Sequence, residues 1–214
     1  MCMERLDILA TQATYDRNAQ KYSASVDKTL AGPIGEFEQR LLDAFIALMP
    51  GAVALDLGCG NGKDAAYLRS KEISATGADY SRGMLKVAKE RHGNTPFVQM
   101  DMRQLGVKSG IISGVWANGC VYHVPKADFA KVLLEVYRIL GCGGIFSFNF
   151  KIGEGEGLEG HPRSFDGGPR YYAYYQVPEM SAMLENAGLK LLVLKAYPKK
   201  IFGETIVHFY AEKT

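Results

Sequence analysis

A short apolar stretch runs directly into three glycines, and this feature constrains the fold more than any other. Residues 52–57 are predicted to form a buried strand, after which Gly58, Gly60 and Gly62 occupy every second position. Glycines at this spacing permit a tight turn and remove side chains where a ligand would touch the backbone. A helix is predicted over 64–71, so its free N–H groups face the same space. The chain is therefore expected to contain an α/β unit with a ligand site at this turn.

Strand and helix patterns alternate from residue 53 onward, which favours a mostly parallel, doubly wound sheet with helices on both faces. In such sheets the ligand site lies at the carboxyl ends of the strands. A long stretch, 151–176, shows no periodicity and is predicted to be irregular. The other strands are predicted over 73–79, 97–100, 111–117, 144–150, 189–196 and 205–212, and the other helices over 81–91, 129–140 and 178–187.

The first fifty residues carry helical patterns in place of the alternation. One pattern lies around 15–22 and the other over 37–49, where apolar residues fall on one helix face. We interpret this segment as a lid and not as a separate domain. The 214 residues are accordingly predicted to form one domain, with a lid over 1–50, a ligand-binding core over 51–150, and a loop, helix and two strands over 151–214.

Composition excludes several classes of protein. Hydrophobic residues make up 47% and the formal net charge is +2, which is too small for a nucleic-acid footprint. No apolar run reaches the length of a signal peptide core or a membrane span. No two cysteines form a C-x-x-C pair, so a metal site is not expected, and isolated cysteines fit a reducing cytoplasm. The four cysteines are Cys2, Cys59, Cys120 and Cys142.

Acidic residues follow three successive predicted strands. Asp56 comes just before the glycines, where it would disfavour a pyrophosphate and favour a cationic ligand. Asp79 can accept both hydroxyls of a ribose, and Ser81 is available to cap the next helix in its place. Asp101 can accept from an adenine amino group; for this residue alone an ordinary loop role is favoured, but three acidic residues at the ends of three successive strands favour a ligand site. A dinucleotide site would need glycines spaced G-x-G-x-x-G, and position 63 is a lysine, which disfavours an NAD-dependent oxidoreductase.

The motifs around these residues closely resemble those of the class I S-adenosylmethionine-dependent methyltransferases, most of all the small bacterial type that acts on small molecules. The resemblance covers about residues 50–150 and is looser elsewhere. It implies a Rossmann-like sheet of seven strands in the order 3-2-1-4-5-7-6, with the last strand antiparallel, and an N-terminal helical lid. The segments that carry it are LDLGCGNGKDAAYL, TGADYSRGMLKVAKER, FVQMDM and VWANGCVYHVPKADFAKVLLEVYRILGCGGIFSFNF.

The resemblance also implies which residues would bind S-adenosylmethionine. The candidates fall in the glycine loop, at the ends of the next three strands and in the lid. Asp56 and the Gly58 carbonyl would hold the methionine amino group, Gly60 and Gly62 would allow close approach, Asp79 would bind the ribose, Tyr80, Met84, Asp101 and Met102 would surround the adenine, Asn118 would lie near the methyl, and Tyr15 and Tyr22 would contact the cofactor from the lid.

The acceptor site is expected in the loops after the fourth and fifth strands. His123 lies there with Tyr122, and it is either a general base or a residue that packs the loop. In the 151–176 loop, Arg170 and Tyr172 are candidate contacts for an anionic or aromatic acceptor, but the tyrosine-rich segment could equally pack as a strand on the sheet edge.

The predicted function is methyl transfer to a small molecule by a protein that is a monomer or a homodimer. The alternative from another class is a non-catalytic protein that binds S-adenosylmethionine, because such a protein would show the same cofactor motifs. A macromolecular acceptor is disfavoured by the near-neutral charge and by the lack of an added docking domain.

Overall fold

The computed structural model describes residues 3–197 and 203–214, with side chains from residue 7 onward. Its centre is a seven-stranded sheet in the order β3-β2-β1-β4-β5-β9-β8. The first five of these strands run parallel, and β9 is inserted antiparallel between β5 and β8. The predicted order 3-2-1-4-5-7-6 is therefore confirmed. The strands are β1 (Val53–Leu57), β2 (Ser74–Asp79), β3 (Phe97–Gln99), β4 (Ile112–Ala117), β5 (Leu140–Lys151), β8 (Leu189–Ala196) and β9 (Ile206–Lys213).

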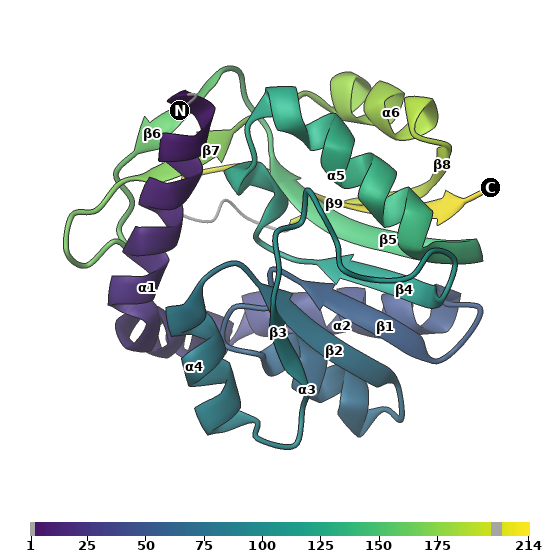
Figure 1. Ribbon diagram of the computed structural model, residues 1–214, viewed down its shortest axis with the longest axis horizontal. Coiled ribbons are helices and arrows are strands. Elements are labelled where there is room, and N and C mark those ends of the chain that lie inside the picture. The colour runs from purple at the N-terminus through teal and green to yellow at the C-terminus, as the bar shows by residue number, and fades with distance from the viewer. Residues whose placement is uncertain (1–2, 198–202) are drawn as a thin grey trace.

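Helices cover both faces of this sheet, because its central strands are apolar on both sides. One core cluster packs α5 and α6 against β4, β5 and β9 around Phe129, Phe148 and Met180. The opposite cluster packs α2 and α3 against Trp116 and Tyr210. Figure 1 shows α5 and α6 on the upper side of the sheet. The helices are α1 (Met3–Leu30), α2 (Pro33–Leu48), α3 (Lys63–Ser70), α4 (Arg82–Arg91), α5 (Lys126–Ile139) and α6 (Val177–Asn186).

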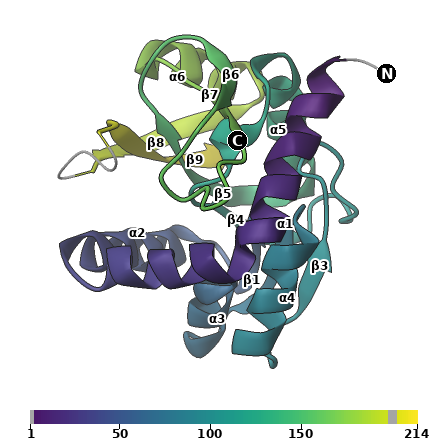
Figure 2. The same ribbon diagram turned by 90° about the vertical axis from the view of Figure 1, so that its left-hand side faces the viewer.

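The sequence predicts a lid over residues 1–50, but the two helices of this segment differ: α2 packs on a face of the sheet, and α1 lies over its edge. It packs on α4 through Ala19, Met84 and Val87, and it also contacts β7 (Arg170–Ala173). Figures 1 and 2 show this long helix crossing the side of the molecule where α4 and the β6–β7 pair lie. Segments more than a hundred residues apart in the chain therefore meet at one end of the sheet.

The prediction that 151–176 is irregular throughout is wrong. Two short strands, β6 (Glu156–Glu159) and β7, pair antiparallel within it. The tyrosine-rich segment thus contains a strand, β7, which pairs with β6, and a bridge between Ile152 and Tyr175 follows directly after it. Strands this short are stabilised by contacts from distant segments, here α1 and the short helical turn Val121–His123, so local periodicity does not reveal them.

Within the described residues, no helix combines the length and apolar character needed to cross a membrane. The largest difference from the predicted elements is in α1, which extends well beyond the helical pattern predicted around 15–22 at both ends. The other differences are shifts of one to four residues at the ends of elements, as in β5, which begins at Leu140 because that residue pairs with Ile112 ahead of a bulge.

Candidate functional site

One large cavity, of about 240 Å³, lies between the lid and the carboxyl ends of β1, β2 and β4. Eleven of the twelve residues predicted to bind a cofactor line it, although their roles toward a ligand stay predictions. The eleven are Tyr15, Tyr22, Asp56, Gly58, Gly60, Asp79, Tyr80, Met84, Asp101, Met102 and Asn118.

The twelfth predicted residue, Gly62, lies outside the lining, so the expectation that it allows close approach of a ligand is not met. Its φ is +80°, and a Cβ here would lie 2.6 Å from the ring of Phe97. Gly62 is therefore required for packing the start of α3 against β3. Gly58, by contrast, lines the cavity with φ +71°, and a Cβ there would meet Cys120.

Asp79 organises the glycine loop as well as facing the cavity. Its two carboxylate oxygens accept hydrogen bonds from the backbone N–H of Gly60 and of Ser81, both at 2.8 Å. Ser81 itself caps α4 by accepting from the Met84 N–H, as the sequence predicts. Burial raises the pKa of Asp79 above its usual value. This carboxylate is thus partly bound to backbone N–H groups before any ligand is considered.

The adenine-reading role predicted for Asp101 has a competitor in the structure. Arg103 donates hydrogen bonds to both carboxylate oxygens of Asp101, and its Nη2 lies 2.7 Å from Oδ2. Its Nη1 lies 2.8 Å from a carboxylate oxygen of Asp128. The hydrogen bonds from Arg103 outweigh partial burial and hold the pKa of Asp101 below its usual value. Asp101 is therefore a carboxylate whose orientation is set by Arg103, with Met102 beside it in the cavity wall.

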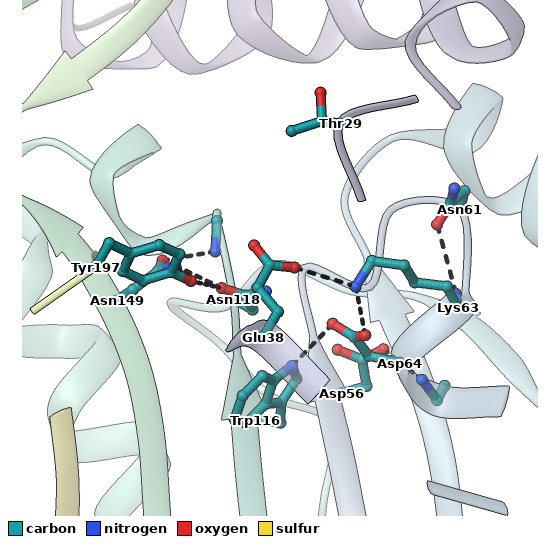
Figure 3. Close-up of polar contacts among 12 residues, drawn as sticks. Thr29, Glu38, Asp56, Asn61, Lys63, Asp64, Trp116, Asn118, Asn149 and Tyr197 are labelled. Carbon is teal, nitrogen blue, oxygen red and sulfur yellow. Dashed lines mark hydrogen bonds and ion pairs between the residues drawn. The ribbon is translucent and has the colours of Figure 1, made fainter. Parts of the chain in front are cut away.

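Four charged residues form what we call the acidic end of the cavity: Glu38, Asp56, Lys63 and Asp64 (Figure 3). The Lys63 ammonium lies 2.6 Å from Asp64 and 3.5 Å from Glu38. Asp56 accepts a hydrogen bond from the Ala65 N–H at 2.9 Å. Three carboxylates therefore share one nearby cation.

The pKa values at the acidic end show how this crowding acts. Burial, followed by the charge of Asp64, raises the pKa of Asp56 well above its usual value. Burial also raises the pKa of Glu38, although Lys63 opposes this effect. Carboxylates in this condition gain from an added positive charge, so this end suits a cationic ligand.

Beside the acidic end lies a polar group that the sequence analysis missed. Asn149, at the end of β5, donates to the side-chain oxygens of Asn118 and Tyr197 and accepts from the Gly119 N–H (Figure 3). These contacts set the orientation of Asn118 in the cavity wall. Asn149 could have been found as a polar residue near the carboxyl end of an apolar strand, whereas nothing local marks Glu38 or Tyr197.

At the opposite side of the cavity lies a group that we call the tyrosine end: Tyr15, Tyr22, Tyr122, His123 and Arg170. The ring of His123 is held at both nitrogens, by the Tyr171 carbonyl at 2.6 Å and the Tyr15 hydroxyl at 2.9 Å. A carbonyl only accepts, so Nδ1 carries the proton and Nε2 accepts from Tyr15. Burial, followed by the charge of Arg170, lowers the pKa of His123 well below its usual value, which keeps the ring neutral.

The two predicted acceptor contacts in the 151–176 segment do not line the cavity. Arg170 and Tyr172 are each 2% exposed and lie behind its wall. Arg170 donates to the Tyr15 hydroxyl at 2.9 Å, so it reaches the cavity through that residue. Tyr122 and His123 do line the cavity, as predicted.

The lid is tied to the core by side-chain hydrogen bonds along its length. Gln12 donates to the Tyr80 carbonyl at 3.0 Å. Asp16 accepts from the Ser81 hydroxyl and, at 2.7 Å, from the Gly83 N–H. These bonds place α1 directly over the cavity.

Comparison with known proteins agrees with this arrangement. Residues 54–144 match the methyltransferase domain family. The chain is 26% identical over 149 residues to a malonyl-[acyl-carrier protein] O-methyltransferase of Salmonella typhimurium, a match that covers 68% of this chain and 55% of the relative. It is 30% identical over 128 residues to methyltransferase GfsG of Streptomyces halstedii, covering 55% and 45%. The chain thus spans about half the length of these curated relatives.

Among solved structures, the chain resembles a 1,6-didemethyltoxoflavin-N1-methyltransferase of Burkholderia thailandensis, crystallised with its substrate and S-adenosylhomocysteine. The TM-score is 0.74, the identity is 20%, and the match covers 100% of this chain and 92% of that one. At this identity the likeness shows the fold. Residues 54–144, which contribute many of the strands and loops that build the cavity, are therefore similar to a methyltransferase domain, and the chain has the fold of this methyltransferase.

Proposed function

We propose that this protein binds S-adenosylmethionine in the cavity under the lid and transfers its methyl group to a small-molecule acceptor. The observation that carries the proposal is the acidic end, where three carboxylates around one lysine meet the glycine loop in a single cavity. When bound, the cofactor supplies an electrophilic methyl group on a positively charged sulfur.

The residues present fit such a ligand in charge. S-adenosylmethionine carries an ammonium and a sulfonium against one carboxylate, so it brings net positive charge. Burial raises the pKa values of Asp56 and Glu38 although Lys63 opposes this, so an added positive charge would stabilise their ionised forms. Lys63 offers the matching partner for the ligand's carboxylate at the same end.

The glycine loop and Asp79 fit the nucleoside part. Gly58 and Gly60 expose backbone to the cavity, and the loop is held in place because the Gly58 N–H donates to the Ala78 carbonyl at 2.7 Å. Asp79 fixes Gly60 in the same way. A carboxylate at the end of β2 can accept ribose hydroxyls with its remaining lone pairs.

The lid would align the two reactants and exclude water. Direct displacement requires the acceptor atom, the methyl carbon and the sulfur to lie in line. Tyr15 and Tyr22 of α1 face the cavity from above, while Asn118 and Tyr122 face it from the sheet. An acceptor held between these two sides would be shielded from solvent.

His123 is placed to position groups and not to accept a proton directly. Its Nε2 already accepts from Tyr15, and its neutral form is favoured by burial. We therefore assign His123 the role of holding Tyr15, which in turn faces the cavity.

Calorimetric titration with S-adenosylmethionine, S-adenosylhomocysteine and NAD tests the proposal. We expect micromolar binding of both adenosyl ligands and none of NAD. Asp79→Asn, which keeps the size of the side chain, should weaken adenosyl binding at least tenfold, because one hydrogen bond to a charged acceptor is worth about 1.5–3 kcal/mol.

The matched control is Glu185→Gln, which removes an exposed negative charge from α6. It should leave all three titrations unchanged. Binding of NAD, or of none of the three ligands, to protein with a native circular dichroism spectrum would contradict the proposal.

A further inference from the structure

A buried positive charge lies directly behind the tyrosine end. Arg170 is 2% exposed, its Nε donates to the Ser164 hydroxyl at 3.1 Å, and its Nη1 donates to Tyr15 at 2.9 Å. Its Nη2 has no hydrogen-bond partner among the described residues. No carboxylate of the described residues forms an ion pair with this guanidinium. Buried charges are ordinarily paired with an opposite charge, so this one lacks its counterpart.

The charge of Arg170 acts on the cavity through aromatic rings. The guanidinium carbon lies 5.2 Å from the ring centre of Tyr15 and 5.9 Å from that of Tyr22, and both rings line the cavity. Only the thickness of these rings separates the cation from a ligand. An anion in the cavity would therefore be attracted electrostatically to this guanidinium, with little water to screen the interaction.

Hydrogen-bond donors face the cavity in front of this charge. Tyr22 and Tyr122 line the cavity, and neither hydroxyl forms a hydrogen bond to any described residue. A phenol hydroxyl donates well to an anionic oxygen, and the bond strengthens when the acceptor is ionised. The donors and the cation behind them form one site for negative charge.

The other buried cation nearby does not compete for this role. Lys151 lies 3.6 Å from the ring centre of Tyr172 but already pairs with Glu204 at 2.5 Å. Of these two buried cations, Arg170 is the one for which no ion pair with a carboxylate of the described residues is formed. The two ends of the cavity consequently favour ligand groups of opposite charge: the acidic end suits a cation and the tyrosine end suits an anion.

We propose that the methyl acceptor of this protein is a small organic anion, bound at the tyrosine end by the Tyr22 and Tyr122 hydroxyls and by the charge of Arg170. The inference rests on the proposed function, because it assigns the chemistry of the second ligand in the same cavity. Arg170 acts as a positioning and charge-selecting residue, since Tyr15 and Tyr22 stand between it and the ligand.

Benzoate and benzamide are suitable probes, because they share size and shape and differ in charge. Each is titrated by calorimetry into protein saturated with S-adenosylhomocysteine at pH 7.5. We expect benzoate to bind at least tenfold more tightly than benzamide. Arg170→Gln should bring the ratio close to one, whereas Arg170→Lys, which restores the charge, should recover most of it.

Two further variants separate this charge effect from general damage. Lys21→Gln removes an exposed positive charge from the same lid helix and should leave the ratio unchanged. Tyr122→Phe removes one donor and should weaken benzoate binding several-fold without affecting benzamide, which keeps the test valid if the Arg170 variants fail to fold.

The outcomes distinguish the two proposals. If S-adenosylhomocysteine does not bind, the proposed function fails and this inference fails with it. If S-adenosylhomocysteine binds but benzoate and benzamide bind equally, or neither binds, the anion inference alone is overturned. An unchanged benzoate preference in Arg170→Gln would also overturn it.

Discussion

The acidic end and the tyrosine end of the cavity differ in how their charges are balanced. At the acidic end Lys63 lies between Glu38 and Asp64, so a cation inside the protein stabilises surrounding carboxylates. At the tyrosine end the buried cation, Arg170, has aromatic rings and hydroxyls around it and no carboxylate among the described residues. The first end has one cation for three carboxylates and still suits an added positive charge, whereas the second leaves a positive charge for a ligand to neutralise.

Removal of Lys63 should have the largest effect on stability. Lys63→Met leaves Glu38 and Asp64 without their cation, and we expect the free energy of unfolding to fall by about 2–3 kcal/mol, below the value for fully buried pairs because the lysine is 29% exposed. Urea denaturation measures this loss. Lys86→Met, an exposed substitution on α4, is the control and should change stability by less than about 0.5 kcal/mol. Equal losses in the two variants would remove the distinction between the ends.

The hydroxyl of Tyr15 should be the next most important group. Tyr15→Phe leaves Nε2 of His123 and Nη1 of Arg170 without this shared partner, and a buried polar group without a partner costs about 1–3 kcal/mol. Tyr22→Phe is the matched variant, because its hydroxyl forms no hydrogen bond within the described part of the chain. Thermal and urea denaturation should therefore show a clear loss for Tyr15→Phe and almost none for Tyr22→Phe.

The two ends should respond to acid with opposite signs. The folded pKa of His123 is lowered, so the unfolded state binds its proton more readily and stability is lost as the pH falls below about 6.5. The pKa of Asp56 is higher in the folded state than in the unfolded state. The folded state therefore binds this proton more readily, and the contribution of Asp56 to stability rises as the pH falls through its folded pKa.

Variants at each end test this difference between pH 6.5 and pH 5. Between these pH values the unfolding free energy should decrease less steeply with falling pH in His123→Gln. The slope should be smaller by up to about 1.4 kcal/mol per pH unit, which corresponds to one proton. Asp56→Asn should make the same decrease steeper. A set of urea denaturation curves across this range measures both slopes, and shifts of the same sign would contradict the assignment of charges.

The smallest predicted effect concerns discrimination between the two adenosyl ligands. Glu38→Gln removes one negative charge from the acidic end and should weaken S-adenosylmethionine binding about threefold, by Coulomb attraction through a partly solvated cavity. S-adenosylhomocysteine lacks the sulfonium and should lose less affinity. Calorimetric titration of the variant with S-adenosylmethionine and with S-adenosylhomocysteine measures the two losses of affinity. Equal losses of affinity would indicate that the sulfonium does not bind near Glu38.

The fold followed from local signals to a large extent. Three elements follow from local patterns: the strand that runs into Gly58 and Gly60, the helix capped by Ser81, and α5 with its apolar face. Each of them lies within a few residues of its predicted bounds. The strand β6 was missed because its residues are mostly exposed and show no apolar alternation, and β7, which the sequence left open as a strand, is buried by its packing against α1.

The candidate site was predicted well where it depends on the strand ends and poorly where it depends on distant segments. Asp56 and Asp79 lie at the carboxyl ends of their strands, Asn118 directly follows one, and all three line the cavity. Glu38 belongs to α2 and reaches Lys63 only because both helices pack at the same end of the sheet. No local pattern marks such a residue.

By itself, the sequence determined the order of strands and helices, the glycine turn and the acidic residues that follow the strands, because these depend on hydrophobic periodicity and on backbone conformations that glycine permits. Only the tertiary structure decided which charges are paired. It placed Lys63 among carboxylates and Arg170 among tyrosines, because burial and the distance between side chains arise when segments far apart in the chain pack together.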